Sequence, residues 1–406
     1  MFMLVLNCGS SSIKFQVRDD SGEALLCRGL IERIGEKEGA IKVTAENGRA
    51  VEEKLAIPDH VFALQRLAEI LISPSLDIMG SVKEITSVGH RVVHGGEIYS
   101  DSVLIDKKAV DTIDKLSKLA PLHNPPNLRG IEACQALLPG VPQVAVFDTS
   151  FHATMPETTY IYPLPRELYE KHHIRRYGFH GTSHRYVSER AIALEGLEKK
   201  PSRIITAHLG NGCSITAIRD GKSVDTSMGF TPLGGLIMGT RTGDIDATLP
   251  FYLLDIGIAK KDVINILQKK SGLLGLSGGL SNDMRTLLDH YNNNPLAKLA
   301  VDAFCYRLKR YIGSYVAALG GLDILIFTGG IGENAARVRE IACEEMECLG
   351  ITLDKEANAD NARKERIISK KNERVKVYVI ATNEELVIAR ETYRVVKDRS
   401  KKSSRA

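Results

Sequence analysis

Three glycine-rich segments, each preceded by a strand-like run, are the most chemically suggestive feature of the 406-residue sequence. They lie at residues 7–12, 208–213 and 328–332. Glycine tolerates positive φ, so such a turn can direct successive backbone N–H groups at one anion. The first segment also holds the hydroxyls of residues 10–12 and is followed by Lys14. One glycine turn is usually only a turn, but three with these neighbours favour a phosphate-binding protein.

The familiar phosphate-binding motifs are missing. Gly221-Lys222-Ser223 resembles the end of a Walker A loop, but Thr216 stands where that loop needs its first glycine. The sequence contains no GxGxxG segment and neither the HRD nor the DFG motif of protein kinases. These absences argue against P-loop NTPases, Rossmann dehydrogenases and protein kinases.

A second group of candidates consists of charged side chains in predicted loops. Arg91 follows a strand-like run, and Arg241 lies in the glycine-rich segment GTRTGD. Asp148 ends a predicted buried strand, where a carboxylate needs a hydrogen-bond partner or a metal. His180 and His184 resemble a two-histidine metal pair, but HExxH is absent, so zinc is disfavoured. Loop arginines and histidines are most often solvated, so the residues alone leave each assignment open.

The elements that must position these residues alternate between strands and helices, which is typical of an α/β fold. Predicted strands at 4–6 and 13–17 flank the first glycine turn, and strands at 204–207 and 214–218 flank the second. An offset of 201 residues superimposes the two hairpins, including the Arg-Asp turns that follow them. Few identities are shared, so coincidence stays open, but the pattern is that of a duplicated domain.

The rest of the chain continues the alternation. A long helix is predicted from Pro295, capped by Asn294 and ended by Gly320-Gly321. A strand at 324–327 precedes the third glycine turn, and a helix is expected from about Glu333. Proline-rich loops place the domain boundary at about 150–165.

Composition excludes several classes of protein. The net charge of +4 comes entirely from the last ten residues, which hold five basic side chains and one aspartate. Residues 1–396 are therefore balanced, which argues against a nucleic-acid-binding face. No apolar run approaches the roughly 20 residues of a membrane span, and no signal peptide is expected. Seven cysteines without a CxxC pair are typical of a reduced, cytoplasmic protein.

Nine segments, in order along the chain, resemble motifs of the acetokinase family. They are LVLNCGSSSIKF at 4–15, GHRVVHGG at 89–96, PLHNPPN at 121–127, VFDTSFH at 146–152, YGFHGTSH at 177–184, AHLGNGCS at 207–214, DTSMGFTPLGGLIMGTRTGDID at 225–246, FTGGIGEN at 327–334 and TNEE at 382–385. The resemblance covers residues 3–396. It implies the fold of acetate and sugar kinases, heat-shock chaperones and actin: two duplicated actin-like (ribonuclease H-like) domains with a nucleotide cleft between them.

This resemblance implies a domain plan. We expect an N-terminal domain at 1–150 and a C-terminal nucleotide-binding domain at 151–383. The last helix, at about 384–396, should pack back on the N-terminal domain. A disordered basic tail is expected at 397–406.

The resemblance also implies catalytic roles. Arg91 matches the arginine that binds the substrate carboxylate, Asp148 matches the catalytic aspartate, and His180 and Arg241 match stabilisers of the transition state. The implied reaction transfers the γ-phosphoryl group of ATP to acetate. Acetate is already ionised at neutral pH, so Asp148 is expected to orient a metal, a water or an arginine rather than to remove a proton.

Binding positions follow in the same way. Asn7 and Glu384 match positions associated with Mg²⁺, for which Mn²⁺ is an alternative. Val93, Leu122, Phe179 and Pro232 match an apolar pocket for the acetate methyl group. Matches to ATP-binding positions are Ser10, Ser12, Lys14, His208, Leu209, Gly210, Asn211, Gly212, Asp283, Met284, Arg285, Ile331, Gly332, Glu333, Asn334 and Ala335.

The resemblance further implies a homodimer that acts on small molecules, without nucleic-acid or membrane partners. Two alternatives stay open. A kinase of propionate or butyrate differs little, because one methylene is worth only about 1–3 kcal/mol of discrimination. A chaperone- or actin-like protein would share the fold but hydrolyse ATP without stimulation by a carboxylate.

Overall fold

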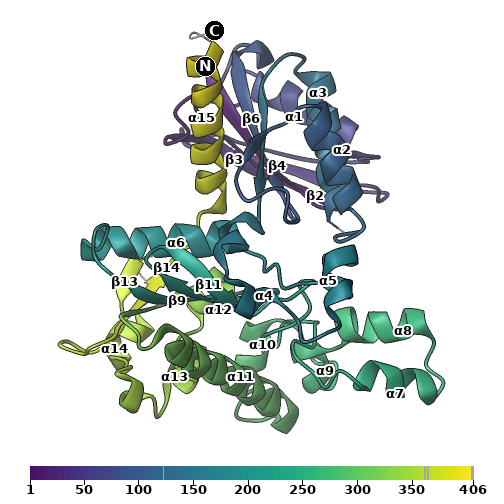
Figure 1. Ribbon diagram of the computed structural model, residues 1–406. Coiled ribbons are helices and arrows are strands. Elements are labelled where there is room, and N and C mark those ends of the chain that lie inside the picture. The colour runs from purple at the N-terminus through teal and green to yellow at the C-terminus, as the bar shows by residue number, and fades with distance from the viewer. Residues whose placement is uncertain (122, 361–362, 364, 404–406) are drawn as a thin grey trace. The chain divides into compact units, whose positions relative to one another are not determined.

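The structure, a computed structural model, describes residues 1–121, 123–360, 363 and 365–403 (Figure 1). The chain divides into two compact units. Unit 1 comprises Met1–Ser150 and Asn383–Ala406, and unit 2 comprises Phe151–Thr382. Each unit contains one mixed sheet with helices packed on it, which confirms the α/β class expected from the sequence.

Unit 1 is built on an eight-stranded sheet with the order β5-β4-β3-β2-β1-β6-β8-β7. The strands are β1 (Phe2–Cys8), β2 (Ser12–Asp19), β3 (Leu25–Glu32), β4 (Gly39–Ala45), β5 (Ala50–Leu55), β6 (Ile85–Val92), β7 (Val103–Leu104) and β8 (Gln143–Phe147). Strands β1, β6 and β8 run parallel, whereas the other neighbours pair antiparallel. The carboxyl ends of the parallel strands therefore meet at one edge, where α/β proteins usually bind ligands.

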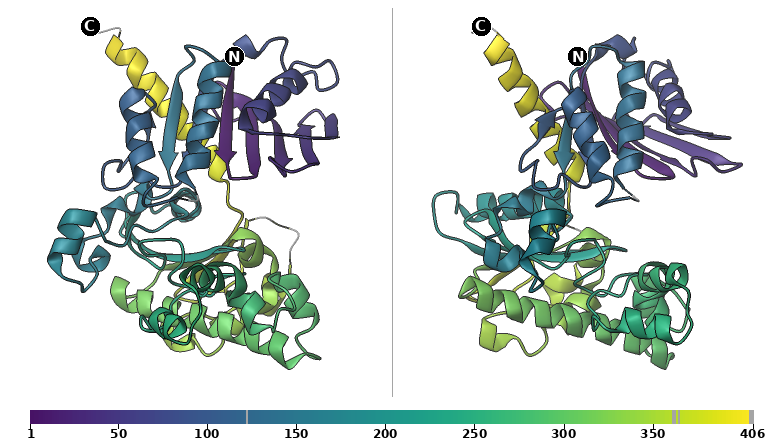
Figure 2. Two further views of the ribbon diagram at one scale, coloured as in Figure 1. Left: turned by 90° about the vertical axis from the view of Figure 1, so that its right-hand side faces the viewer. Right: turned by 45° about the vertical axis from the view of Figure 1, so that its right-hand side comes forward.

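Helices cover both faces of this sheet (Figure 1, Figure 2). They are α1 (His60–Leu71), α2 (Lys107–Leu116), α3 (Asn124–Leu137) and α15 (Glu384–Ser403). The first three share apolar clusters with side chains such as Leu4 and Val92, while Ile388 of α15 packs with Met3 on the other face. The close approach of α15 to β6 requires Gly89, because a Cβ there would lie 2.3 Å from Thr392 Oγ1.

Unit 2 contains a six-stranded sheet with the order β11-β10-β9-β12-β14-β13. The strands are β9 (Arg203–Leu209), β10 (Cys213–Arg219), β11 (Lys222–Thr226), β12 (Ile324–Thr328), β13 (Glu365–Ile367) and β14 (Lys376–Ile380). From β11 to β14, order and direction repeat those of β3-β2-β1-β6-β8 in unit 1. The duplication expected from the 201-residue offset is thus visible in the topology, since β9 begins 201 residues after β1.

The helices of unit 2 also lie on both faces of its sheet. They are α4 (Glu157–Tyr160), α5 (Arg166–His172), α6 (Gly181–Glu195), α7 (Leu249–Asp255), α8 (Lys260–Asn265), α9 (Gly272–Leu276), α10 (Met284–Asp289), α11 (Pro295–Leu319), α12 (Gly329–Asn334), α13 (Ala336–Cys343) and α14 (Lys355–Ala359). Val187 of α6 packs with Ile204 and Ile326, and Figure 1 shows α11 beneath the opposite face. The caps of α11 are those expected: Asn294 accepts from Leu296 N–H, and Gly320 has φ 68°.

Short helical turns complete the secondary structure. They are η1 (Val82–Glu84), η2 (Ser150–Thr154), η3 (Ile266–Lys270) and η4 (Glu347–Leu349). No helix in the described part of the chain combines the length and the apolarity needed to cross a membrane.

Two helix ends differ from the sequence analysis. The helix expected from about Glu333 begins at Gly329, because extended Thr328 serves as its N-cap, so most of the third glycine segment is helical. Helix α15 continues to Ser403, although a disordered tail was expected from residue 397. Residues 397–403 contain no glycine or proline, and lysines and arginines both favour helices and complement the negative end of the helix dipole.

Candidate active site

Three polar side chains converge at the carboxyl ends of the parallel strands of unit 1. Asn7 lies in β1, Arg91 in β6, and Asp148 directly follows β8. Arg91 donates from Nε to Asp148 Oδ1 (3.0 Å), from a second nitrogen to Asp148 Oδ2, and from a third to Asn7 Oδ1 (3.2 Å). The register explains this convergence, because Val92 pairs with Phe147, the residue before Asp148.

Glu384, the first residue of α15, adds a second carboxylate to this cluster. Its Oε2 lies 3.9 Å from Arg91 Nε. Burial raises the pKa of Glu384, the positive charge of Arg91 lowers it, and the negative charge of Asp148 raises it again, with a net upward shift. Burial lowers the pKa of Arg91, but Asp148 and Glu384 outweigh that effect and keep the guanidinium charged.

The oxygens around Arg91 are of the kind that Mg²⁺ prefers. Asp148 is completely buried and Glu384 is largely so, while Asn7 contributes an amide oxygen. Among the described residues, no group of three His, Cys, Asp or Glu side chains could hold a metal. A metal bound here would complete its coordination with water and substrate, as Mg²⁺ commonly does.

The side chains of the first glycine turn, and Lys14 after it, make contacts of their own. Lys14 pairs with Asn7 in register, and its Nζ lies 2.5 Å from Glu385 Oε1. Ser10 is exposed and Ser12 is half-buried, in a turn closed by a hydrogen bond from Gly9 N–H to the Ser12 carbonyl (2.8 Å). More than half of the Lys14 side chain is exposed, so solvent reaches it alongside its ion pair with Glu385.

Of the residues expected to form an apolar pocket, unit 1 contributes Val93. It is buried directly after β6, and its N–H donates to Asn127 Oδ1 (3.0 Å). Phe179 and Pro232 belong to unit 2. Leu122 lies outside the described residues.

In unit 2, His180 and Arg241 both approach Gly212. A Cβ built on Gly212 would lie 3.6 Å from His180 Nε2 and 3.6 Å from a terminal nitrogen of Arg241. His180 has φ 58°, a left-handed conformation that costs about 1–3 kcal/mol and persists only where the surroundings enforce it. Because Gly212 has no side chain, the space beside its Cα is bordered by the imidazole of His180 and the guanidinium of Arg241. Such a space suits an anion.

Arg241 has no carboxylate among its partners in the described part of the chain. Its terminal nitrogen donates to the Pro232 carbonyl (3.0 Å) and approaches Met238 Sδ (3.7 Å). Burial lowers the pKa of Arg241, and nearby Cys213 raises it only in part. A cation desolvated without a counter-charge is poised for an anionic ligand.

The second glycine turn adjoins this site. His208, the residue before the end of β9, pairs with Ser214, and its ring lies 4.3 Å from that of His180. Leu209 is buried in the core, and Gly210 N–H donates to the Gly212 carbonyl (3.1 Å).

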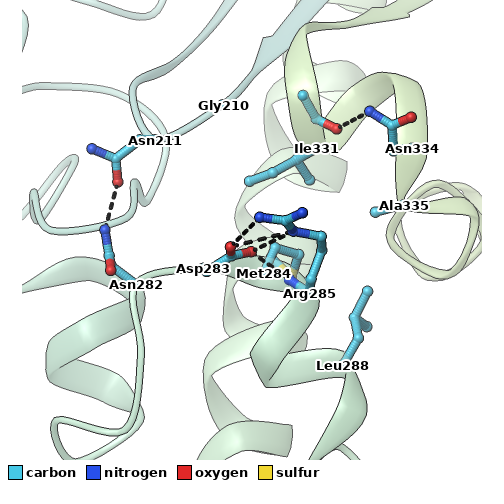
Figure 3. A pocket seen from close by; sticks show the side chains of 11 residues that line it. Gly210, Asn211, Asn282, Asp283, Met284, Arg285, Leu288, Ile331, Asn334 and Ala335 are labelled. Carbon is cyan, nitrogen blue, oxygen red and sulfur yellow. Dashed lines mark hydrogen bonds and ion pairs between the residues drawn. The ribbon is translucent and has the colours of Figure 1, made fainter. Parts of the chain in front are cut away.

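A cavity of about 670 Å³ opens beside Gly210 and Asn211 (Figure 3). Asn282, Asp283, Met284, Arg285 and Leu288 line it from the loop before α10 and from α10 itself; Gly330, Ile331, Asn334 and Ala335 line it from α12 and its end. Figure 3 shows the Arg285 side chain between Asp283 and the segment of Ile331 to Ala335. The volume suits a ligand of nucleoside size.

The structure separates the expected nucleotide residues of unit 2 into two groups. Gly210, Asn211, Asp283, Met284, Arg285, Ile331, Asn334 and Ala335 line the cavity, whereas His208, Leu209, Gly212, Gly332 and Glu333 do not. The carboxylate of Glu333 instead accepts from Gly329 N–H (2.9 Å) and Thr382 N–H (3.2 Å), so it organises the start of α12.

Three cavity residues were missed: Asn282, Leu288 and Gly330. Asn282 donates to Asn211 Oδ1 (3.1 Å), a pairing across 71 positions that no local signal announces. Leu288 shares the helical face of Met284, four residues before it, and this spacing could have identified it.

Comparison with known proteins agrees with these observations. The profile of the Acetokinase family matches residues 2–390. An acetate kinase of Thermotoga petrophila is 50% identical over 399 residues, covering 98% of this chain and 99% of the relative.

Two solved structures are also similar. The acetate kinase of Porphyromonas gingivalis superimposes with a TM-score of 0.92 at 45% identity, over 97% of this chain and 99% of that one. A propionate kinase of Francisella tularensis does so with a TM-score of 0.90 at 44% identity, with the same coverage. The chain therefore belongs to the acetokinase family, whose members are phosphotransferases with a carboxyl group as acceptor.

Proposed function

We propose that this protein is an acetate kinase that reversibly transfers the γ-phosphoryl group of ATP to acetate, giving acetyl phosphate and ADP. One observation carries the proposal: Arg241, half-buried and without a carboxylate partner among the described residues, lies with His180 beside the Cα of Gly212. This anion-binding arrangement belongs to the same unit as the nucleoside-sized cavity.

The proposed reaction needs charge stabilisation more than acid–base chemistry. The acetate carboxylate is ionised above about pH 5, so it attacks without losing a proton. In-line transfer spreads negative charge over the equatorial oxygens of the phosphoryl group. Preorganised donors directed at that charge are the largest available source of catalysis. We assign this task to His180 and Arg241, and the binding of the acetate carboxylate to Arg91.

A divalent metal, Mg²⁺ or Mn²⁺, is assigned to the oxygens of Asn7 and Glu384. Bound there with ATP, it would neutralise charge on the phosphates. Asp148 accepts two hydrogen bonds from Arg91, and this geometry supports a role in orienting the guanidinium. Lys14 would contact the nucleotide phosphates after leaving Glu385. Ser10 and Ser12, in the turn beside it, are assigned to the same phosphates.

The residues lining the cavity of unit 2 are assigned to the adenosine moiety, and the turn of His208 to Gly212 to its phosphates. Gly332 and Glu333 would act indirectly, by shaping α12. The apolar pocket for the methyl group is assigned to Val93, Leu122, Phe179 and Pro232.

The experiment that tests the proposal is ATP-dependent formation of acyl phosphate, trapped with hydroxylamine, in the presence of acetate, propionate or butyrate. We expect the highest kcat/KM with acetate. Hydrolysis of ATP without stimulation by any carboxylate would instead indicate a chaperone- or actin-like protein. A higher kcat/KM with propionate would assign the substrate to that acid.

Val93 is expected to limit the size of the acid. Val93→Ala should raise kcat/KM for propionate relative to acetate roughly tenfold, because one methylene of space is worth about 1–3 kcal/mol. The measurement is the ratio of kcat/KM for the two acids. Val110→Ala, a similar truncation in α2, should leave the ratio unchanged. If both variants behave alike, Val93 does not contact the acid.

We also propose a homodimer in the cytoplasm. The seven cysteines are all free thiols, which supports a reducing compartment. Helix α7 is apolar except for Asp255 at its end, yet none of its residues is buried, and Phe251 and Tyr252 are 66% and 60% exposed. Exposed apolar surface of this kind usually marks a protein interface, and this supports self-association through α7.

Phe251→Asp is therefore expected to convert a dimer into monomers, because it introduces a charge into the apolar contact. Sedimentation velocity at micromolar concentration measures the outcome. Ile98→Asp, which alters an equally exposed apolar side chain in unit 1, serves as the control. A Phe251→Asp variant that stays dimeric would exclude α7 from the interface.

A further inference from the structure

His180 is the last member of a chain of hydrogen bonds inside unit 2. Its Nδ1 lies 2.8 Å from Ser214 Oγ, which in turn lies 2.7 Å from His184 Nε2. On the far side of that ring, His184 Nδ1 lies 2.6 Å from Thr206 Oγ1. Ser214, His184 and Thr206 have no exposed surface. They come from three elements, β10, α6 and β9, so the tertiary fold assembles the chain of bonds.

The number of protons on these side chains decides which group donates and which accepts in each hydrogen bond. Burial, together with the neighbouring His152 and His208, lowers the pKa of His184 well below its ordinary value, so its ring is neutral. A neutral imidazole carries one N–H, and its other nitrogen is an acceptor. The ring of His184 can therefore donate either to Thr206 or to Ser214, but not to both.

Only one of these two directions gives an acceptor to each of the protons of Thr206, His184 and Ser214. If His184 donated to Thr206, the hydroxyl proton of Thr206 would have no acceptor among the described residues. Leaving a buried donor unpaired is unfavourable. In the other direction, Thr206 donates to His184 Nδ1, His184 Nε2–H donates to Ser214, and Ser214 donates to His180 Nδ1. The protons of Thr206, His184 and Ser214 then all have acceptors, and the N–H of His180 is on Nε2, the atom beside Gly212.

We propose that Thr206, His184 and Ser214 are positioning residues that hold His180 in the tautomer with its N–H on Nε2, the nitrogen beside Gly212. In this tautomer the ring donates a hydrogen bond to an anion at Gly212. In the other tautomer it would present a lone pair and repel the phosphoryl oxygens. The catalytic part of this inference rests on the role proposed above for His180, whereas the tautomer itself does not.

The tautomer can be read directly by ¹⁵N NMR of the nucleotide-free enzyme labelled with ¹⁵N-histidine. Protonated and unprotonated imidazole nitrogens have well-separated shifts, and His180→Asn identifies the signals of His180 by their loss. We expect a protonated Nε2 and an unprotonated Nδ1 for His180. His152 is an internal reference, because its Nε2 lies 3.0 Å from the Phe179 carbonyl and must carry a proton.

The chain of hydrogen bonds from Thr206 through His184 and Ser214 to His180 is called the relay below. Two substitutions break it in different places. Thr206→Val, which keeps the shape of the side chain, and Ser214→Ala should each move His180 toward a mixture of tautomers. Turnover should fall about tenfold, less than the 10²–10³ expected for loss of a charge-stabilising donor, with little change in KM for ATP. Thr206→Ser restores the hydroxyl and should restore both readouts.

Thr216→Val is the matched control. Its hydroxyl is equally buried in β10, two residues from Ser214, but it bonds to Thr226 and not to a histidine. This variant should leave the signals of His180 and the turnover unchanged.

Each outcome is decisive. A proton on Nδ1 of His180 in the wild type, or His180 signals that Thr206→Val and Ser214→Ala leave unchanged, would overturn the relay. The expected shifts in the spectrum without any fall in turnover would support the relay and overturn the catalytic role proposed for His180. If Thr216→Val lowered turnover as much as the other two variants, the losses would be due to disturbed packing and not to the relay.

Discussion

Replacing Arg241 with alanine is expected to lower turnover by about 10²–10³, the usual cost of removing one preorganised charge-stabilising donor. The fold should stay intact, because the guanidinium is desolvated without a carboxylate partner in the described part of the chain. Its loss removes one hydrogen bond to the Pro232 carbonyl, and no carboxylate among the described residues loses a cationic partner. The affinity for ATP should change far less than turnover, because the adenosine cavity does not include Arg241.

The measurement combines kcat at saturating acetate, ATP and Mg²⁺ with nucleotide binding by calorimetry and thermal unfolding. Arg219→Ala is the control, because the exposed guanidinium of this β10 residue donates, within the part of the chain that the structure describes, only to the Ala318 carbonyl (3.2 Å). Arg241→Lys restores the charge but not the planar fork and should recover only part of the activity. Near wild-type turnover in Arg241→Ala would remove Arg241 from the proposed mechanism.

Arg91 shows where reasoning from the sequence was incomplete. Its segment suggested a charged residue in a loop, but Arg91 lies in β6 and forms two hydrogen bonds with Asp148. Truncation of Arg91 would remove two charge-assisted hydrogen bonds from the completely buried Asp148. Breaking such a pair typically costs about 3–5 kcal/mol. Arg91→Ala is therefore a poorer test of catalysis than Arg241→Ala, because a fall in its turnover could come from unfolding as well as from loss of a catalytic group.

Most of the fold could be predicted because its signals are local. Glycine turns between alternating strands, the cap at Asn294 and the 201-residue offset all survive in the structure. The convergence of Asn7, Arg91 and Asp148 follows once β1, β6 and β8 are known to be parallel.

The features that could not be predicted from the sequence are contacts between residues far apart in the chain and the ends of helices. The contact of Asn282 with Asn211 joins two loops that share no pattern. The carboxylate of Glu333 bonds to the backbone of Gly329 and of Thr382, which is 49 residues away, and no local pattern indicates the second contact. The polar composition after residue 396 suggested disorder, but composition alone does not end a helix that lacks glycine and proline.

Asp148→Asn is the second substitution with a large expected effect, and it separates an orienting role from that of a general base. The amide keeps the shape but removes the charge that Arg91 pairs with, and its nitrogen cannot accept the second hydrogen bond. We expect turnover to fall by about 10²–10³ and the Mg²⁺ requirement to rise, because the oxygens of the adjoining Asn7 and Glu384 lose a fixed neighbour. The pKa of Glu384 should fall, since the negative charge of Asp148 raises it in the wild type.

The pH dependence of kcat distinguishes the two roles. A general base would give the wild type an ascending limb with an apparent pKa near 6–7, and Asp148→Asn would abolish it. We expect no such limb between about pH 5 and 8, because acetate titrates near pH 4–5 and its attack releases no proton. Both profiles are measured at saturating acetate, ATP and Mg²⁺. A limb present in the wild type and absent in the variant would establish proton transfer through Asp148, and the argument that an ionised nucleophile needs no base would fail.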